Sequence, residues 1–246
     1  MAGLLDTFTI SKRGLNVQQS NINTSSHNIA NANTVGFSRQ RSVIQTTRPF
    51  GGASRFDTCT VGQVGTGAEV TAIQRVRDQF LDYQVRSKTT ESGGLNIKYQ
   101  YLYQAENILN DSSDAGIQNA LNEFFDAFQE ISKAPEKTSN RDVAISQAAA
   151  LADMINSKYT QLEKKKSDAQ SLLTQNVAEI NGILDSINSL NKQISSIAAI
   201  GMTPNDLMDQ RDNLLDELSA KFGINVDRDS RETINLTTTE KQDRKS

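Results

Sequence analysis

A chain of 246 residues can form one or two domains around a sizeable core. Only 36% of its residues are hydrophobic, 6% are aromatic and none is tryptophan, which argues against a compact enzyme with a deep core. The 26 basic and 29 acidic residues give a net charge of -3, so the chain lacks the one-sided positive charge of a nucleic-acid-binding protein. We therefore expect no nucleic acid among its partners.

The cysteine count and the absence of known motifs exclude further functional classes for this protein. Cys59 is the single cysteine, so the chain cannot by itself form an intramolecular disulfide or a cysteine-based metal cluster. No apolar run approaches the ~20 residues that cross a bilayer, and the N-terminus lacks the basic and apolar regions of a cleaved secretory signal. The sequence contains no catalytic pattern such as H-E-x-x-H or G-x-S-x-G. We expect no membrane association, no metal, no cofactor and no catalytic residues.

Residues 1–34 have the pattern of a weak assembly helix. Apolar residues recur every seven positions, with leucines one turn earlier, and this seam consists of Leu4, Leu5, Phe8, Leu15, Ile22 and Ile29. The residues between them are mostly Asn, Gln, Ser and Thr, which have middling or poor helix propensity. Burying the four side chains of the heptad track contributes roughly 6–12 kcal/mol, whereas ordering about thirty backbone units costs on the order of 30–60 kcal/mol before hydrogen bonds offset it. We predict a segment that is unfolded in the free monomer and helical among neighbouring subunits. The alternative is an ordinary amphipathic helix docked on its own domain.

Residues 35–76 are expected to form an extended segment with a β-hairpin. Two stretches, Ser42–Thr47 and Ala68–Ile73, are rich in β-formers, and glycines separate them.

Residues 77–222 carry helical periodicity and predict a long helical bundle. Ser113 or Asp114 is expected to cap a helix that ends at Pro135. The next helix is predicted to run from about Ser139 to Ile200, far beyond the usual globular length. Its two heptad tracks, offset by three residues, are typical of a coiled coil: Tyr159, Lys166, Leu173, Ile180, Ile187 and Ile194, with Leu162, Ala169, Asn176, Ile183, Leu190 and Ile197.

A last helix follows Gly201 and Pro204, and Asn205 and Asp206 are expected to cap it. Its apolar positions, expected to face the bundle, are Leu207, Met208, Leu214, Leu215 and Leu218. Its carboxylates, Asp209, Asp212, Asp216 and Glu217, are expected to form solvated salt bridges with Arg211 and Lys221 of the same helix.

Residues 223–246 look like the start of a truncated β-rich domain. Ile224–Val226 and Thr233–Thr237 predict two short strands, which do not make a stable sheet alone, so we expect the sequence to be a fragment. The predicted fold class is mainly α: an elongated helical bundle or coiled coil with a small β-hairpin region and a weak N-terminal assembly helix.

The segment from Ser25 to Gln40 resembles a signature of bacterial flagellar axial proteins, the family of rod, hook and hook-associated proteins. The shared core is N-I-A-N-x-N-T-x-G-[YF], with Phe37 in place of the commoner tyrosine. The matching residues, with the three that follow, are Asn28, Ile29, Ala30, Asn31, Asn33, Thr34, Gly36, Phe37, Ser38, Arg39 and Gln40. Ser38–Gln40 is similar to the version found in hook-associated proteins that join hook to filament. Asn205–Ser219 is similar to a stretch that follows the long helix in those proteins.

The resemblance implies a structural subunit of the bacterial flagellum at the hook–filament junction. It implies export by the flagellar type III secretion apparatus without a cleaved signal peptide, and an extracellular location. The implied partners are identical subunits in a ring, the hook protein, the neighbouring hook-associated protein, the export apparatus and an export chaperone.

Other classes remain open from the residues alone. Another rod or hook protein would share the motif, and a cytosolic coiled-coil adaptor would share the heptads. An adaptor, however, has no need of a weak N-terminal helix that ends in this motif. An enzyme would have to use His27, the single histidine, for which the sequence shows no positioned partner.

Overall fold

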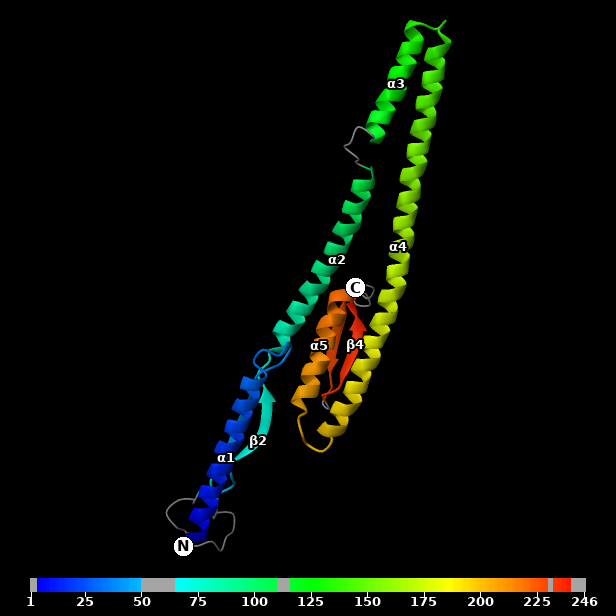
Figure 1. Ribbon diagram of the computed structural model, residues 1–246. Coiled ribbons are helices and arrows are strands. Elements are labelled where there is room, and N and C mark those ends of the chain that lie inside the picture. Colours follow the sequence, from blue (N-terminus) through cyan, green and yellow to red (C-terminus); the bar gives the residue numbers. More distant parts are fainter. Residues whose placement is uncertain (1–3, 50–64, 110–115, 230–231, 240–246) are drawn as a thin grey trace. The chain divides into compact units, whose positions relative to one another are not determined.

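The computed structural model describes residues 4–49, 65–109, 116–229 and 232–239. The element order is α1 (Leu4–Ala30), β1 (Gln40–Thr46), β2 (Ala68–Arg75), α2 (Gln79–Leu109), α3 (Ile117–Lys133), α4 (Thr138–Ala198), α5 (Asn205–Lys221), β3 (Ile224–Arg228) and β4 (Ile234–Thr238) (Figure 1). The predicted mainly α class is confirmed, and the four predicted strands are present as two antiparallel pairs. No helix in these described ranges is long and apolar enough to cross a membrane.

The chain divides into two compact units. Met1–Thr90 and Gly182–Ser246 form the first unit, and Glu91–Asn181 form the second. Both α2 and α4 therefore begin in one unit and end in the other. The sequence predicted four consecutive segments divided at residues 34, 76 and 222, whereas the first unit combines two separate parts of the chain. The predicted segments describe roles in assembly, and they stay a prediction.

The second unit holds α3 and the longer part of α4. Phe124 packs against Phe125 and Phe128 with ring centroids 5.5 and 4.8 Å apart. The N-cap of α3 is Gly116, with no side-chain cap, whereas the expected caps Ser113 and Asp114 lie outside the described residues. The heptad residues Tyr159 and Leu173 are 63% and 65% exposed.

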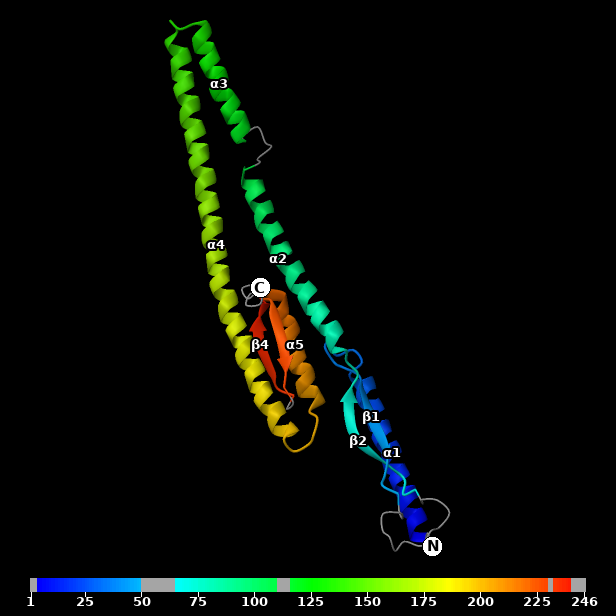
Figure 2. The same cartoon turned by 180° about the vertical axis from the view of Figure 1, so that it is seen from behind.

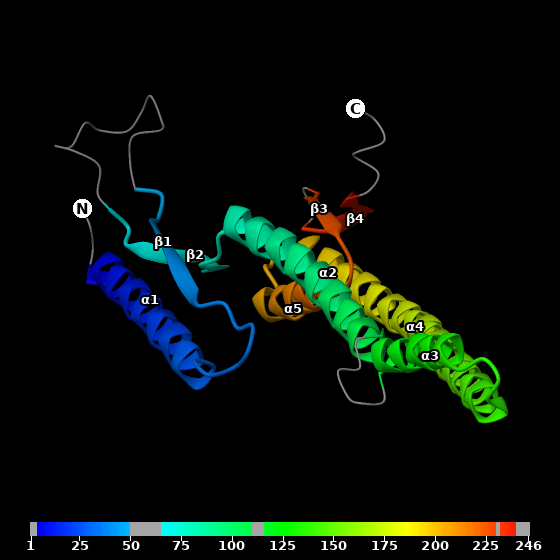
Figure 3. The same ribbon diagram turned by 90° about the horizontal axis from the view of Figure 1, so that it is seen from above.

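In the first unit, α1 lies along the β1–β2 pair, as the view from above shows (Figure 3). The register runs from Gln40↔Arg75 to Thr46↔Ala68, with a bulge between Val43 and Ile44. Arg13 of α1 donates to the carbonyl oxygen of Thr66 at 2.8 Å. We call residues 4–49 and 65–77 the N-terminal module. Among its described residues, Val17 is the one buried hydrophobic side chain, so the module has almost no apolar core.

The apolar core of the first unit lies between α4, α5 and the β3–β4 hairpin, which lie side by side in both views (Figures 1 and 2). Its side chains are Ile183, Ile187 and Ile194 from α4, Met208, Leu215 and Leu218 from α5, and Ile224 and Ile234 from the strands. The hairpin pairs Ile224 with Thr238 and Arg228 with Ile234. The heptad tracks are therefore buried at the C-terminal end of α4.

The start of α5 corrects one prediction. Pro204 occupies the N-cap position and makes no side-chain cap. Asn205 is the first residue of the helix, and its amide nitrogen donates instead to the carbonyl oxygen of Ile73 at 2.8 Å. The capping role predicted for Asn205 and Asp206 was wrong because this amide binds a distant strand.

Candidate functional site: the N-terminal helix and its joint with α5

The heptad track of α1 forms an exposed apolar seam on the helix. The exposed fractions are 81% for Leu5, 69% for Phe8, 70% for Leu15, 61% for Ile22 and 77% for Ile29. Leu4 begins the helix, but its side chain lies outside the described part. The seam is therefore a single face, and no helix among the described residues of the first unit covers it.

The other face of α1 packs on the β1–β2 pair. Val17 and Thr24 are 5% and 7% exposed, and the Thr24 hydroxyl lies 3.1 Å from that of Ser42. The helix thus docks on its own strands through a mostly polar face, while the apolar face points outward. The prediction that this helix is unfolded in the free monomer stays a prediction.

The family motif forms the exit from α1 into β1. The Asn28 side chain donates to the Gln40 carbonyl oxygen and accepts from the Gln40 N–H, both at 2.8 Å. The Asn31 side chain donates to the His27 carbonyl oxygen at 3.0 Å and so satisfies the end of the helix. The Thr34 hydroxyl in turn donates to Asn31 Oδ1 at 3.3 Å.

Gly36 makes the sharp turn after the helix possible. Its φ is +77°, in the left-handed region that favours glycine. A Cβ at this position would also collide with the Asn213 side chain of α5. The remaining motif residues, Ile29, Ala30, Asn33 and Arg39, are exposed.

Residues 27–40 of the module contact the first turns of α5, and we call this contact the joint. Ser38 donates its backbone N–H to Asp209 Oδ2 at 3.0 Å, and Gln40 Nε2 donates to Asp206 Oδ1 at 2.9 Å. His27 Nε2 lies 3.5 Å from the same Asp206 oxygen, and its ring meets the edge of Phe37 at 5.4 Å. These contacts account for His27 as part of the joint.

One face of α5 consists of polar side chains, several of which contact the N-terminal module. Asn205, Asp209, Asp212 and Asp216 recur at helical spacing and therefore lie on one face. Asn205, Asp209 and Asp212 are only 7%, 5% and 0% exposed. Asp209 and Asp212 do not form the predicted solvated salt bridges within α5, because both are buried against arginines from other elements. Asp216 is 47% exposed and pairs with Arg86 and Arg77 of other elements, and a pair between Glu217 and Lys221 stays a prediction.

Asp212 is the centre of a cluster of charges. Its Oδ2 lies 2.8 Å from Arg75 Nη1 and 3.8 Å from Arg77 Nη1. Its Oδ1 lies 3.4 Å from Arg228 Nη2 and 3.6 Å from Arg86 Nη2. Four guanidiniums from β2, the β2–α2 junction, α2 and β3 therefore converge on one buried carboxylate.

The neighbouring carboxylates complete the network. Asp209 Oδ1 accepts from Arg75 Nη1 at 2.7 Å, and Asp216 Oδ1 accepts from Arg86 Nε at 2.6 Å. We call Asp209, Asp212 and Asp216 with Arg75, Arg77, Arg86 and Arg228 the Asp212 cluster. Buried charges are tolerated when they are paired in this way.

Arg211 lies on a different face of α5 and pairs with no carboxylate of its own helix, contrary to the prediction. It is 0% exposed, and its Nη1 donates to Asn191 Oδ1 at 2.9 Å and to the Glu232 carbonyl oxygen at 2.6 Å. Its pKa is lowered to about 10, mainly by burial; Asp212 opposes this shift, and Arg228 and Arg75 contribute to it. Arg211 thereby holds Glu232, which precedes β4 and has a φ of +59°.

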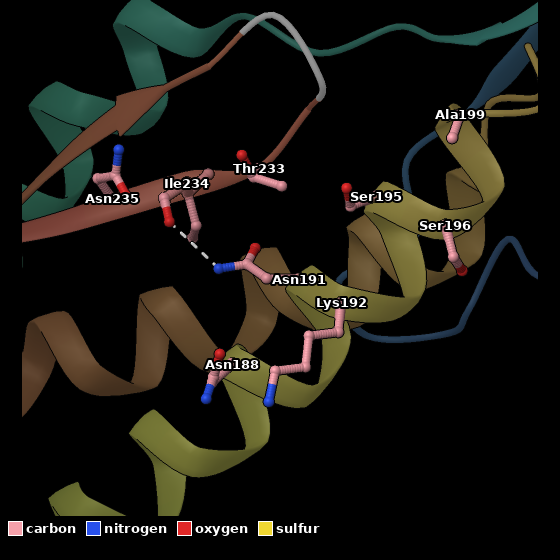
Figure 4. Close-up of a pocket in the computed structure, with 9 residues that line it drawn as sticks. All are labelled: Asn188, Asn191, Lys192, Ser195, Ser196, Ala199, Thr233, Ile234 and Asn235. Atoms are coloured by element: carbon pink, nitrogen blue, oxygen red, sulfur yellow. Dashed lines mark hydrogen bonds between the residues drawn. The ribbon is translucent and has the colours of Figure 1, made fainter.

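A shallow polar recess of about 580 Å³ lies beside this contact, between α4 and β4 (Figure 4). Asn191 stands in it and donates to the Ile234 carbonyl oxygen at 3.2 Å. Its lining is Asn188, Asn191, Lys192, Ser195, Ser196, Ala199, Thr233, Ile234 and Asn235. The recess brings together none of the residues predicted as site residues.

The Asp212 cluster makes stability depend on acid pH. Burial alone would raise the pKa of Asp212, but Arg75, Arg77 and Arg228 hold that pKa below its ordinary value. A depressed carboxyl pKa stabilises the fold above the unfolded value of about 3.9, and this contribution is lost as pH falls through the folded pKa. We expect the free energy of unfolding to fall steeply below about pH 4, as urea titrations across pH 2–7 would measure. An Asp212→Asn variant should show a shallower fall, and an equally steep one would assign the acid sensitivity to other groups.

Comparison with known proteins agrees with this architecture. Residues 102–243 match the family described as the flagellar hook-associated protein FlgK helical domain. The chain belongs to the FlgK family. Residues 9–37, in the N-terminal helix and its exit motif, match the flagella basal body rod protein family.

Individual FlgK relatives match most of this chain. It is 38% identical to flagellar hook-associated protein 1 of Bacillus subtilis over 87% of the chain and 42% of that protein. The Salmonella typhimurium protein of the same name is 32% identical over 91% of the chain and 39% of its own length. The flagellar hook junction protein FlgK from Burkholderia pseudomallei has a similar structure, with a TM-score of 0.58 at 27% identity over 64% of this chain and 27% of that one. The chain spans about two fifths of the length of the curated relatives.

Proposed function

We propose that this chain is part of a structural subunit of the bacterial flagellum that forms the junction between hook and filament. Membership of the FlgK family supports the proposal, since the relatives are named hook-associated and hook junction proteins. The FlgK-family match over residues 102–243 favours this role over another rod or hook protein, because the matches to rod proteins are shorter. They cover residues 9–37 for the rod-protein family and 31% of the chain for a basal-body rod protein FlgG.

The observation that carries the proposal is the exposed seam of α1. Five apolar side chains, each at least 61% exposed, lie along one face at coiled-coil spacing. Covering each of them with a partner helix would contribute about 1.5–3 kcal/mol. The seam is thus suited to packing among identical subunits in a ring and against the hook protein and the neighbouring hook-associated protein.

Export through the flagellar type III apparatus, with the help of an export chaperone, belongs to the same proposal. Among its described side chains the N-terminal module has one buried hydrophobic residue, so little apolar contact opposes its unfolding for transport. No catalysis is needed for this role, and His27 serves the joint with α5.

Leu15→Asp combined with Ile22→Asp tests the seam. We expect the variant of the full-length protein, returned to a strain lacking it, to be secreted normally but to leave hooks without attached filaments. The physical reason is that two buried carboxylates would replace two apolar contacts in every subunit of a ring. Electron microscopy of hooks, swimming assays and immunoblots of the medium provide the readouts.

Asn16→Asp is the matched control, since Asn16 is exposed on α1 beside the seam. It adds the same type of charge to the same helix and should leave filaments in place. Filaments on cells that carry the seam variant would contradict the proposed assembly surface. Loss of the variant from the medium would instead indicate an export defect.

A further inference from the structure

The two oxygens of Asp212 serve different parts of the first unit. Oδ2 contacts Arg75 and Arg77, which belong to the N-terminal module. Oδ1 contacts Arg228 of the β3–β4 hairpin and Arg86 of α2. A single buried negative charge is therefore shared between the N-terminal module on one oxygen and the β3–β4 hairpin, together with α2, on the other.

The distances show which segment holds the carboxylate more closely. The contact with Arg75, at 2.8 Å, has the length of a good charge-assisted hydrogen bond. The contacts with Arg228 and Arg86, at 3.4 and 3.6 Å, are longer than the 2.7–2.9 Å of such bonds. Arg77, on the module side, is also distant, at 3.8 Å, so Arg75 alone holds the carboxylate closely. A move of the carboxylate toward Arg228 would shorten the contact with the hairpin at the expense of the contact with Arg75.

Charge repulsion acts in the same direction. Arg75, Arg77, Arg86 and Arg228 all approach one carboxylate that is 0% exposed. In a poorly solvated site these guanidiniums repel one another with little screening by solvent. Removing one of them relieves its repulsion of the other guanidiniums, so those that remain can approach Asp212 more closely.

We propose that Asp212 couples the two segments by competition, so that release of the N-terminal module from α5 tightens the seating of the β3–β4 hairpin. Coupling of this kind is reciprocal, since each segment must change the stability of the other by the same free energy. The two-state element is the carboxylate itself, drawn either toward β2 or toward β3. A neighbouring subunit that pulls α1, β1 and β2 away from α5 would then change the stability of the β3–β4 hairpin.

Arg75→Gln tests the coupling in the isolated chain, by hydrogen exchange at individual amides under native conditions. We expect the β1–β2 amides to exchange at least tenfold faster than in the unsubstituted chain. The β3–β4 amides should exchange at least threefold slower. Arg41→Gln is the control, because Arg41 is an exposed arginine of the neighbouring strand β1, and it should leave the hairpin rates unchanged.

Arg228→Gln tests reciprocity without touching the N-terminal module. Under competition, the β1–β2 amides of this variant should exchange more slowly. If both variants instead accelerate exchange in both hairpins, the cluster is one cooperative unit and the proposal is overturned. Unchanged exchange in the distant hairpin of each variant would overturn it as well. These measurements on the isolated chain are independent of whether the protein assembles at the hook–filament junction.

Discussion

Asp212→Asn should destabilise the first unit by about 3–5 kcal/mol, because it leaves several buried guanidiniums without their shared counter-charge. The asparagine has nearly the same shape, so the loss reports charge rather than packing. The carboxylate it replaces is 0% exposed and contacts four arginines. Equilibrium unfolding in urea at pH 7, monitored by circular dichroism, measures the effect.

Asp185→Asn is the matched control for this substitution. Asp185 is an exposed carboxylate on α4, where a lost charge should change the free energy of unfolding by no more than about 0.5 kcal/mol. A loss below about 1 kcal/mol in Asp212→Asn would mean that the arginines pair with Asp209 and Asp216 well enough to make Asp212 dispensable.

Gly36→Ala should destabilise the protein by at least about 1–2 kcal/mol, the usual cost of a left-handed backbone conformation for a residue with a Cβ. The new methyl group must in addition displace the Asn213 side chain of α5. The turn after α1 and its contact with α5 would therefore be strained together. Thermal unfolding of the variant, compared with the unsubstituted chain, gives the loss.

Gly14→Ala is a control of opposite sign. Gly14 lies inside α1, and nothing stands within 4 Å of the position that its Cβ would take. Alanine there should stabilise the helix by about 0.5–1 kcal/mol. A Gly36→Ala variant as stable as Gly14→Ala would contradict the strained turn. Adding Asn213→Ala to Gly36→Ala should recover only the part of the loss due to the collision.

Local pattern was enough to predict the elements and their order. Period-seven spacing located α1 and the long α4, and alternating β-formers located both strand pairs, because these signals depend on neighbours in the chain. The capping predictions were less successful. Asn205 has the chemistry of an N-cap, but its amide binds Ile73, a contact between residues far apart in the sequence.

The joint could not be predicted for the same reason. Asp209 and Asp212 look like ordinary residues of a charged helix, and their arginine partners lie 134 and 137 residues away. The signal available in the sequence was the spacing of Asn205, Asp209, Asp212 and Asp216, which puts four polar side chains on one face beside the face of Met208, Leu215 and Leu218. Such a helix can bury both its apolar and its acidic residues when arginines from other segments pack against the acids. The sequence does not say which segments those are.

The Asn28–Gln40 contact explains why one position of the motif demands an amide. A carboxamide, like a peptide group, has a donor and an acceptor next to each other. Asn28 therefore pairs with the backbone of Gln40 at the start of β1 as a neighbouring strand would. Aspartate has the same size but, when ionised, only acceptors. Spontaneous deamidation at this single site would therefore turn one of the two bonds into a repulsion between oxygens. The exit from α1 would be weakened by a chemical change that leaves the length and volume of the chain almost unaltered.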